Sequence, residues 1–164
     1  MKTVFSTYNS IIDRVNRIAG WFIAILLVVM TILISWQVFA RFVMGSPLEF
    51  SEEIARFIMI WLTMIGAAYA YRKGTLISVD VLIEFTGRKI TKSLNILVPF
   101  ISIIFALALI IYGFDLLDRV SSQTAPSTRI SMFWPNLAIP ISGILILFNS
   151  IALIIDEFIE KGDS

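Results

Sequence analysis

Residues 49–73 read EFSEEIARFIMIWLTMIGAAYAYRK and place a group of charges at the mouth of an apolar segment. The uncharged part, residues 57–71, is shorter than the roughly 20 residues that a helix needs to cross a bilayer, so the span must include Glu52, Glu53 and Arg56. On a helix both carboxylates lie within one turn of the Arg56 guanidinium, and both can pair with it. Carboxylates are also favoured in the first turn of a helix. This stretch therefore predicts a membrane span that begins at its charges.

The composition of the whole chain agrees with this reading. Hydrophobic residues make up 58% of the 164 residues and the mean hydropathy is +0.89, whereas soluble domains have roughly 45–50% apolar residues. The net charge is only +1 and the basic residues are scattered, which argues against a nucleic-acid surface. We therefore expect an all-α protein that crosses the membrane several times.

The chain contains no cysteine and no histidine. Disulfides, thiolate nucleophiles, iron–sulfur clusters, bis-histidine haem and ordinary zinc sites all require one or both of these residues. Few redox or hydrolytic chemistries remain without them. We therefore expect no metal, no cofactor and no enzymatic activity.

Four apolar runs follow one another along the chain. They predict a single membrane domain, residues 1–164, with transmembrane helices at about 18–41, 50–72, 93–115 and 135–156. The first uncharged run, residues 18–40, is longer than the apolar core of a signal peptide, so we interpret it as a retained anchor. In the second span Gly66 and Ala70 are four residues apart, which predicts either a face of small residues for close helix packing or small residues that face lipid.

The segments that flank these spans have a different character. In residues 1–17 and at the start of the first span, apolar residues recur at spacings of four and three, which predicts an amphipathic helix lying on the membrane surface. These residues are Val4, Tyr8, Ile11, Val15 and Ile18. Residues 76–92 are too short to cross and predict a cytoplasmic interfacial helix, with Asp80 as a cap. Residues 120–134 are polar and predict a periplasmic loop.

The orientation follows from the distribution of Lys and Arg over the loops. Nine of these residues lie at the two termini and in the loop between the second and third spans, against three on the opposite side, namely Arg41, Arg119 and Arg129. Loops rich in Lys and Arg stay in the cytoplasm, so we expect both termini to be cytoplasmic. The charged cluster around Glu52 and the 120–134 loop then share the outer face.

The cores of the four predicted spans contain no charged residue. A charge at the centre of a membrane helix costs roughly 2.5–3.5 kcal/mol on insertion scales, and such residues usually mark an ion or proton pathway. We therefore expect the substrate pathway to lie in another polypeptide. Remaining polar residues such as Thr63 and Asn149 are expected to form hydrogen bonds between helices.

Two roles are open for the outer charges. One is a network of ion pairs that joins the first two spans, in which Arg41 faces Glu49, Glu52 or Glu53 across the short turn between the spans. The other is a docking patch for a partner outside the cytoplasm. The two roles are compatible with each other.

The order of residues in this chain resembles that of a known family, the small membrane subunit (DctQ-like) of tripartite ATP-independent periplasmic (TRAP) transporters. The residues that carry the resemblance are Arg41, Pro47, Ser51-Glu52-Glu53, Ala55-Arg56, Trp61, Gly66-Ala67-Ala68, Arg72 and Val79-Asp80. The architecture agrees over nearly the whole chain. The sequence departs from the family at Leu76, where a histidine often stands.

The resemblance implies a subunit of a complex in the bacterial inner membrane. Its partners would be a large multi-span subunit with the substrate and sodium sites and a periplasmic binding protein that delivers an organic acid, such as sialic acid or a C4-dicarboxylate. The small subunit would be a static scaffold. Its outer charges, Arg41, Glu49, Glu52, Glu53 and Arg56, would stabilise the outer end or meet the binding protein, and Trp61 would be a packing or interface aromatic.

Two other functions compete with this interpretation. A small four-helix exporter that couples to protons as a homodimer would need a membrane-embedded carboxylate free to exchange protons, and Glu52 and Glu53 are the only candidates. Both have Arg56 within one helical turn. A membrane cytochrome subunit is nearly excluded by the missing histidines.

Overall fold

The computed structural model describes residues 2–45, 49–74 and 88–161, and within these ranges the chain is almost entirely helical. Four helices are long and apolar enough to cross a membrane, as the sequence predicts. The helices are α1 (Lys2–Val43), α2 (Glu49–Lys73), α4 (Arg88–Val120), the short α5 (Phe133–Asn136) and α6 (Ala138–Lys161). The predicted all-α membrane fold is therefore confirmed.

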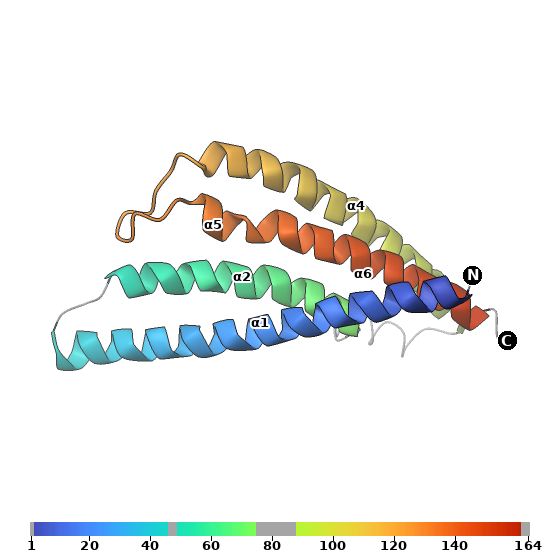
Figure 1. Cartoon of the computed structure of the whole chain (residues 1–164), viewed down its shortest axis with the longest axis horizontal. Helices are drawn as coiled ribbons and strands as arrows, with labels where there is room; N and C mark the ends of the chain where they lie inside the picture. Colours follow the sequence, from blue (N-terminus) through green and yellow to red (C-terminus); the bar gives the residue numbers. More distant parts are fainter. Residues whose placement is uncertain (1, 46–48, 75–87, 162–164) are drawn as a thin grey trace.

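The long helices lie side by side in a row, in the order α1, α2, α6 and α4 (Figure 1). Helix α4 packs along α6, α6 along α2, and α2 along α1. The row fans out toward one end and converges at the other, where both termini lie (Figure 1). We call the end with the termini the inner end and the opposite one the outer end. The predicted cytoplasmic location of the inner end stays a prediction.

Helix α1 differs from the sequence prediction at its start. We expected a surface helix over residues 1–17 and a separate span from residue 18, but one helix runs from Lys2 to Val43 without a break. The chain has no proline near this boundary that would stop a helix. The face that the protein covers also differs from the predicted stripe, because Ile12, Asn16 and Ala19 are buried while Ile11 and Val15 are exposed.

Small residues let α4 and α6 approach closely. A Cβ added to Gly143 would lie 3.0 Å from the Leu109 side chain, and one added to Gly113 would lie 3.0 Å from the Pro140 ring. Ala106 on α4 has no exposed surface. Close backbone approach of this kind is typical of membrane helices, which gain little from burying large apolar side chains that lipid solvates equally well.

Within the described part of the chain, Gly66 is not on the face through which the second span packs. A Cβ added to Gly66 would meet nothing within 4 Å, whereas Ala55, Ile65 and Ala68 of the same helix are buried. The packed face of α2 is therefore displaced from Gly66 and contains Ala68.

The connections between helices also refine the prediction. Pro135 lies in the short helix α5 and α6 begins at Ala138. The candidate membrane span covers Phe133–Glu157, close to the predicted 135–156. The expected loop at 120–134 forms a hairpin over residues 121–132, with a single antiparallel bridge between Thr124 and Ser131. Residues 75–87, which include Asp80 and most of the predicted interfacial helix, lie outside the described residues.

Candidate functional site

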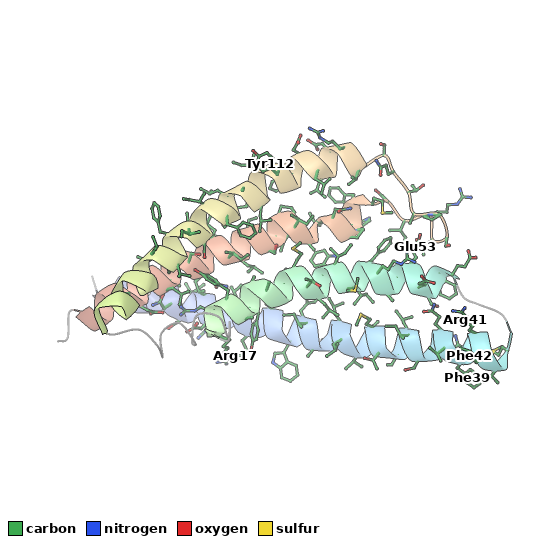
Figure 2. The ribbon with its side chains drawn as sticks, turned by 180° about the vertical axis from the view of Figure 1, so that it is seen from behind. Arg17, Phe39, Arg41, Phe42, Glu53 and Tyr112 are labelled. Atoms are coloured by element: carbon green, nitrogen blue, oxygen red, sulfur yellow. The ribbon has the colours of Figure 1, made fainter. Side chains whose placement is uncertain are left out.

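Glu53 joins the outer end of α2 to the hairpin 121–132. One carboxylate oxygen accepts a hydrogen bond from the Thr128 amide at 2.6 Å, and the other lies 3.5 Å from the Ser127 amide. The Ser127 hydroxyl also donates to the Glu49 carboxylate at 3.4 Å. Hydrogen bonds from backbone amides to a charged carboxylate are stronger than neutral ones, so Glu53 holds the hairpin against α2 (Figure 2).

The hairpin has internal order of its own. The Ala125 amide donates to the Ile130 carbonyl and the Met132 amide donates to the Gln123 carbonyl, both at 2.9 Å. Ala125 is fully buried. Arg129 lies at the tip with a φ of 58°, a left-handed conformation that is uncommon outside glycine. The hairpin therefore presents the exposed Arg129 side chain from a fixed backbone.

The second carboxylate of the cluster, Glu52, has different partners. It forms the ion pair with Arg56, and the Gln37 amide of α1 donates to it at 3.4 Å. The sequence predicted that Arg56 could pair with both carboxylates, but the structure gives it Glu52 while Glu53 turns to the hairpin. Both members of the Glu52–Arg56 pair are more than half exposed, so the pair contributes little to stability.

The predicted link from Arg41 to these acids is absent within the described ranges of the chain. Arg41 lies at the outer end of α1 (Figure 2), is exposed, and forms no ion pair with Glu49, Glu52 or Glu53. Its positive charge is therefore available to a partner. The contact between α1 and α2 at this end comes from Gln37 instead.

Trp61 lies in the middle of α2 and contacts two other helices. Its indole N–H donates to the Trp134 carbonyl of α5 at 3.2 Å. Its ring also meets Phe22 of α1 edge to face, with 5.9 Å between the ring centroids. Trp61 is thus a packing residue that joins α1, α2 and α5.

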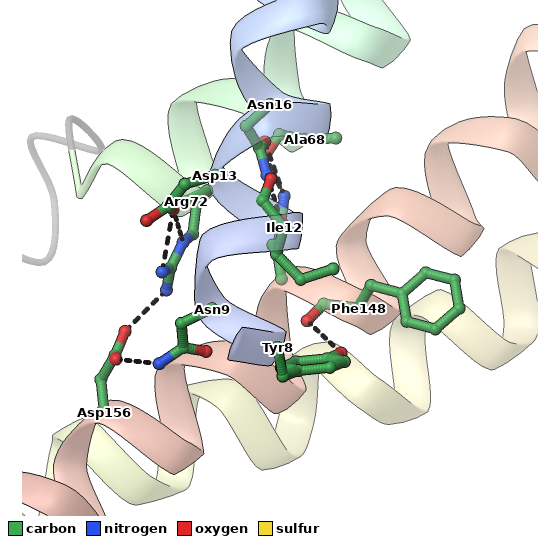
Figure 3. A network of polar contacts seen from close by, with 10 residues as sticks. Tyr8, Asn9, Ile12, Asp13, Asn16, Ala68, Arg72, Phe148 and Asp156 are labelled. Carbon is green, nitrogen blue, oxygen red and sulfur yellow. Dashed lines mark hydrogen bonds and ion pairs between the residues drawn. The ribbon is translucent and has the colours of Figure 1, made fainter. Parts of the chain in front are cut away.

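The inner end holds a second polar cluster, which was not predicted from the sequence. Arg72 of α2 lies between two carboxylates, 3.0 Å from Asp13 of α1 and 2.8 Å from Asp156 of α6 (Figure 3). The Arg72 side chain is only 9% exposed. Asp156 also accepts a hydrogen bond from Asn9 of α1. One guanidinium therefore joins three helices.

One turn deeper, two buried asparagines join the same helices. Asn16 of α1 donates to Asn149 of α6 at 2.6 Å, and Asn149 donates back at 3.2 Å (Figure 3). Asn149 also donates to the Ala68 carbonyl of α2 at 2.9 Å. Near the start of α1 the Tyr8 hydroxyl donates to the Phe148 carbonyl at 3.2 Å. The expected role of Asn149 in bonding between helices is found in these contacts.

A signal for the inner cluster was present in the sequence. Four antiparallel spans bring the start of the first, the end of the second and the end of the fourth to the same side of the membrane. Asp13, Arg72 and Asp156 stand at those three positions. Opposite charges at coinciding span ends predict ion pairs, but only the packing order α1, α2, α6 decides which ones form.

Polar side chains thus join the helices at both the outer and the inner end. Within the part of the chain that the structure describes, no three acidic side chains come close enough to hold a metal ion. Residues 30–160 match the family described as tripartite ATP-independent periplasmic transporters, DctQ component. The chain belongs to this family.

Relatives of the chain include proteins from two bacteria. It is 27% identical over 137 residues to the sialic acid TRAP transporter permease protein SiaT of Haemophilus influenzae. These residues make up 84% of this chain but 22% of that protein. It is 21% identical to the sialic acid TRAP transporter small permease protein SiaQ of Vibrio cholerae, over 84% of this chain and 79% of that protein. A putative TRAP transporter small permease protein of Haemophilus influenzae is 26% identical over 84% of this chain and 83% of that protein.

Membership of the DctQ family confirms the resemblance drawn from the sequence. The chain is a multi-pass protein of the inner membrane and a small subunit of the TRAP type. The family is one of transporter components that work within a larger complex. Because the chain spans only about a fifth of the length of SiaT, the activity of that larger permease is not carried over to this chain.

Proposed function

We propose that this chain is a scaffold that supports a separate large transport subunit in sodium-coupled uptake of an organic acid. A periplasmic binding protein would deliver that acid. Membership of the DctQ family supports the proposal, and two relatives are named as sialic acid transporters. Sialic acid is therefore the first substrate to test, followed by C4-dicarboxylates.

The observation that carries the proposal is the absence of charge from the apolar part of every described span. Residues 18–40, 57–71, 97–114 and 134–155 contain no Asp, Glu, Lys or Arg. A carrier that couples solute movement to an ion needs groups inside the membrane that bind the ion, and these groups are usually ionisable. Two of the buried polar side chains in the described structure, Asn16 and Asn149, are also engaged with each other.

The shape of the molecule supports a scaffold role. The row of helices buries little of its large apolar surface, and Ile18, Trp21 and Phe42 of α1 are each 69–78% exposed. A broad, thin apolar body offers a long flank to a larger membrane subunit. The polar contacts at both ends fix the helices relative to one another, which suits a part that stays still while its partner moves.

The outer end supports contact with a binding protein. Glu53 fixes the hairpin, while Arg41 and Arg129 are exposed. These two cations would meet acidic side chains of the binding protein, and Glu52 with Arg56 would border the contact. Glu49, Glu53 and Trp61 would act indirectly, by holding the hairpin and α5 in place.

Uptake in proteoliposomes tests the proposal. The chain, a co-expressed large TRAP subunit and the binding protein should together accumulate labelled sialic acid when a sodium gradient is imposed, and omission of the chain should abolish uptake. The chain alone should accumulate nothing. Accumulation of a cation by the chain alone against a proton gradient would overturn the scaffold role and favour the exporter.

A charge reversal tests the docking patch separately. Arg41→Glu should raise the concentration of binding protein that gives half-maximal uptake, because it reverses an exposed cation that forms no ion pair with the described residues. Arg119→Glu is the matched control at the same end, since Arg119 pairs with Asp115 on α4. Equal effects of the two substitutions would contradict the proposed patch.

A further inference from the structure

A cavity of about 690 Å³ lies at the inner end between α1, α2 and α6. Three cationic side chains and two carboxylates line it, namely Arg17, Arg72, Lys73, Asp13 and Asp156. Arg72 is fully engaged, because it pairs with both carboxylates. The charges that are left to a ligand therefore belong to Arg17 and Lys73, and the cavity as a whole has a net charge of +1.

Arg17 and Lys73 are exposed and face the same cavity from different helices. The Lys73 ammonium lies over the Tyr69 ring, 6.0 Å from the ring centre. The face of an aromatic ring attracts a cation at this distance. Neither cation forms an ion pair within the described residues. Two such cations at one mouth attract a single anionic group.

The surroundings of the cavity are those of a lipid–water boundary. Trp21, which is 70% exposed, and Tyr69 line the cavity beside the cations, and Trp and Tyr are enriched at the headgroup level of membranes. On a neighbouring face of the same helix, Ile18 and Ile25 are exposed. An anion that enters here from the bilayer would have apolar surface beneath it for acyl chains.

We propose that this cavity binds the headgroup of one monoanionic phospholipid, with its phosphodiester between Arg17 and Lys73. One negative charge neutralises the net charge of the cavity, and the adjacent face of α1 receives the acyl chains. The predicted orientation places the site in the cytoplasmic leaflet, where anionic lipids attract Lys and Arg near the surface. The proposal does not depend on the proposed scaffold role.

Native mass spectrometry of the purified chain tests the site. We expect one molecule of dioleoylphosphatidylglycerol to remain bound, in preference to dioleoylphosphatidylcholine, which has the same phosphate but a fixed cation. The pair of substitutions Arg17→Gln and Lys73→Gln should weaken binding about 30-fold, since each cation near a membrane surface adds roughly a factor of five. Arg14→Gln is the matched control, because Arg14 is exposed on the same helix but does not line the cavity.

Gly20→Val provides a variant that keeps every charge. Gly20 lines the cavity, and a Cβ there would lie 3.0 Å from the Tyr69 ring, so the larger side chain should displace that ring into the cavity and also weaken lipid binding. Thermal unfolding without added lipid shows whether each variant is folded. If the double substitution prevents folding, the Gly20→Val variant alone tests the site, and the proposal requires that it lose the bound lipid.

Four results would overturn the proposal. They are equal binding of the two lipids, equal losses with Arg14→Gln and the double substitution, a stabilisation by inorganic phosphate that matches that of the lipid, and no loss of lipid with Gly20→Val. The same measurement on the complex with the large subunit adds a fifth. Lipid that is bound by the chain alone and absent from the complex would assign the cavity to a protein contact.

Discussion

The asparagine pair allows a quantitative test of how the inner end is held together. Asn149→Leu removes three hydrogen bonds, two to Asn16 and one to the Ala68 carbonyl. Hydrogen bonds between membrane helices contribute about 0.6 kcal/mol each on average, so the loss is about 2 kcal/mol. The substitution also leaves the side-chain oxygen of Asn16 unpaired in a residue that is only 3% exposed. This adds to the loss, so about 2 kcal/mol is a lower limit.

A double-mutant cycle separates the pair from its surroundings. Asn16→Leu alone should also cost about 2 kcal/mol. Both substitutions together should cost well under about 4 kcal/mol, because the hydrogen bonds between the two asparagines are then lost only once and neither asparagine is left without the other. The assay is reversible unfolding of the purified chain in mixed micelles. Thr31→Val is the control, since exposed Thr31 bonds only to the Leu27 carbonyl of its own helix. If the two losses add within about 0.5 kcal/mol, the asparagines do not act as a pair.

Three further predictions concern other parts of the structure. Glu53→Gln should speed amide exchange of Ser127 and Thr128, because a neutral amide accepts their hydrogen bonds less strongly than a carboxylate. Gly143→Val should lower the melting temperature, since overpacking against α4 costs about 1–3 kcal/mol. Arg72→Gln should destabilise the chain and increase proteolysis near the inner end, because it leaves two carboxylates without their cation.

Each of these has a matched control within the chain. Glu52→Gln should leave exchange in the hairpin unchanged, because Glu52 bonds to Arg56 and Gln37 instead. Gly66→Val should be tolerated, since nothing lies within 4 Å of the added Cβ. Arg119→Gln breaks a pair whose members are more than half exposed and should have little effect. A control that matches its test variant would refute the corresponding reasoning.

The sequence predicted the spans because hydropathy is a local property. Each apolar run long enough to cross a bilayer is a helix in the structure. The connection of the first seventeen residues to α1 was missed for a related reason, since amphipathic spacing identifies a helix but not where it ends. The last span was predicted as one helix, whereas a short helix that contains Pro135 precedes α6, because proline fits a short helical turn as well as the start of a long helix.

The partners of individual side chains depend on packing that the sequence does not contain. Arg56 stands within one turn of Glu52 and Glu53, and only the position of the hairpin decides that Glu53 turns away from it. Arg41 is close in sequence to the same acids but pairs with none of them in the described structure. Asn16 lies outside the predicted apolar stripe of residues 1–17, and it is buried because α1 contacts α6 there.

The length of α1 constrains how the protein sits in its bilayer. Its 42 residues extend over about 63 Å at 1.5 Å per residue, roughly twice the thickness of the hydrocarbon layer. Since the helix is unbroken, its first four turns cannot lie flat along the surface while the remainder stands upright, so the entire rod must lean or protrude. Arg72 and Asn149 connect that rod to two neighbours, and a thinner or thicker bilayer would therefore tilt three helices together.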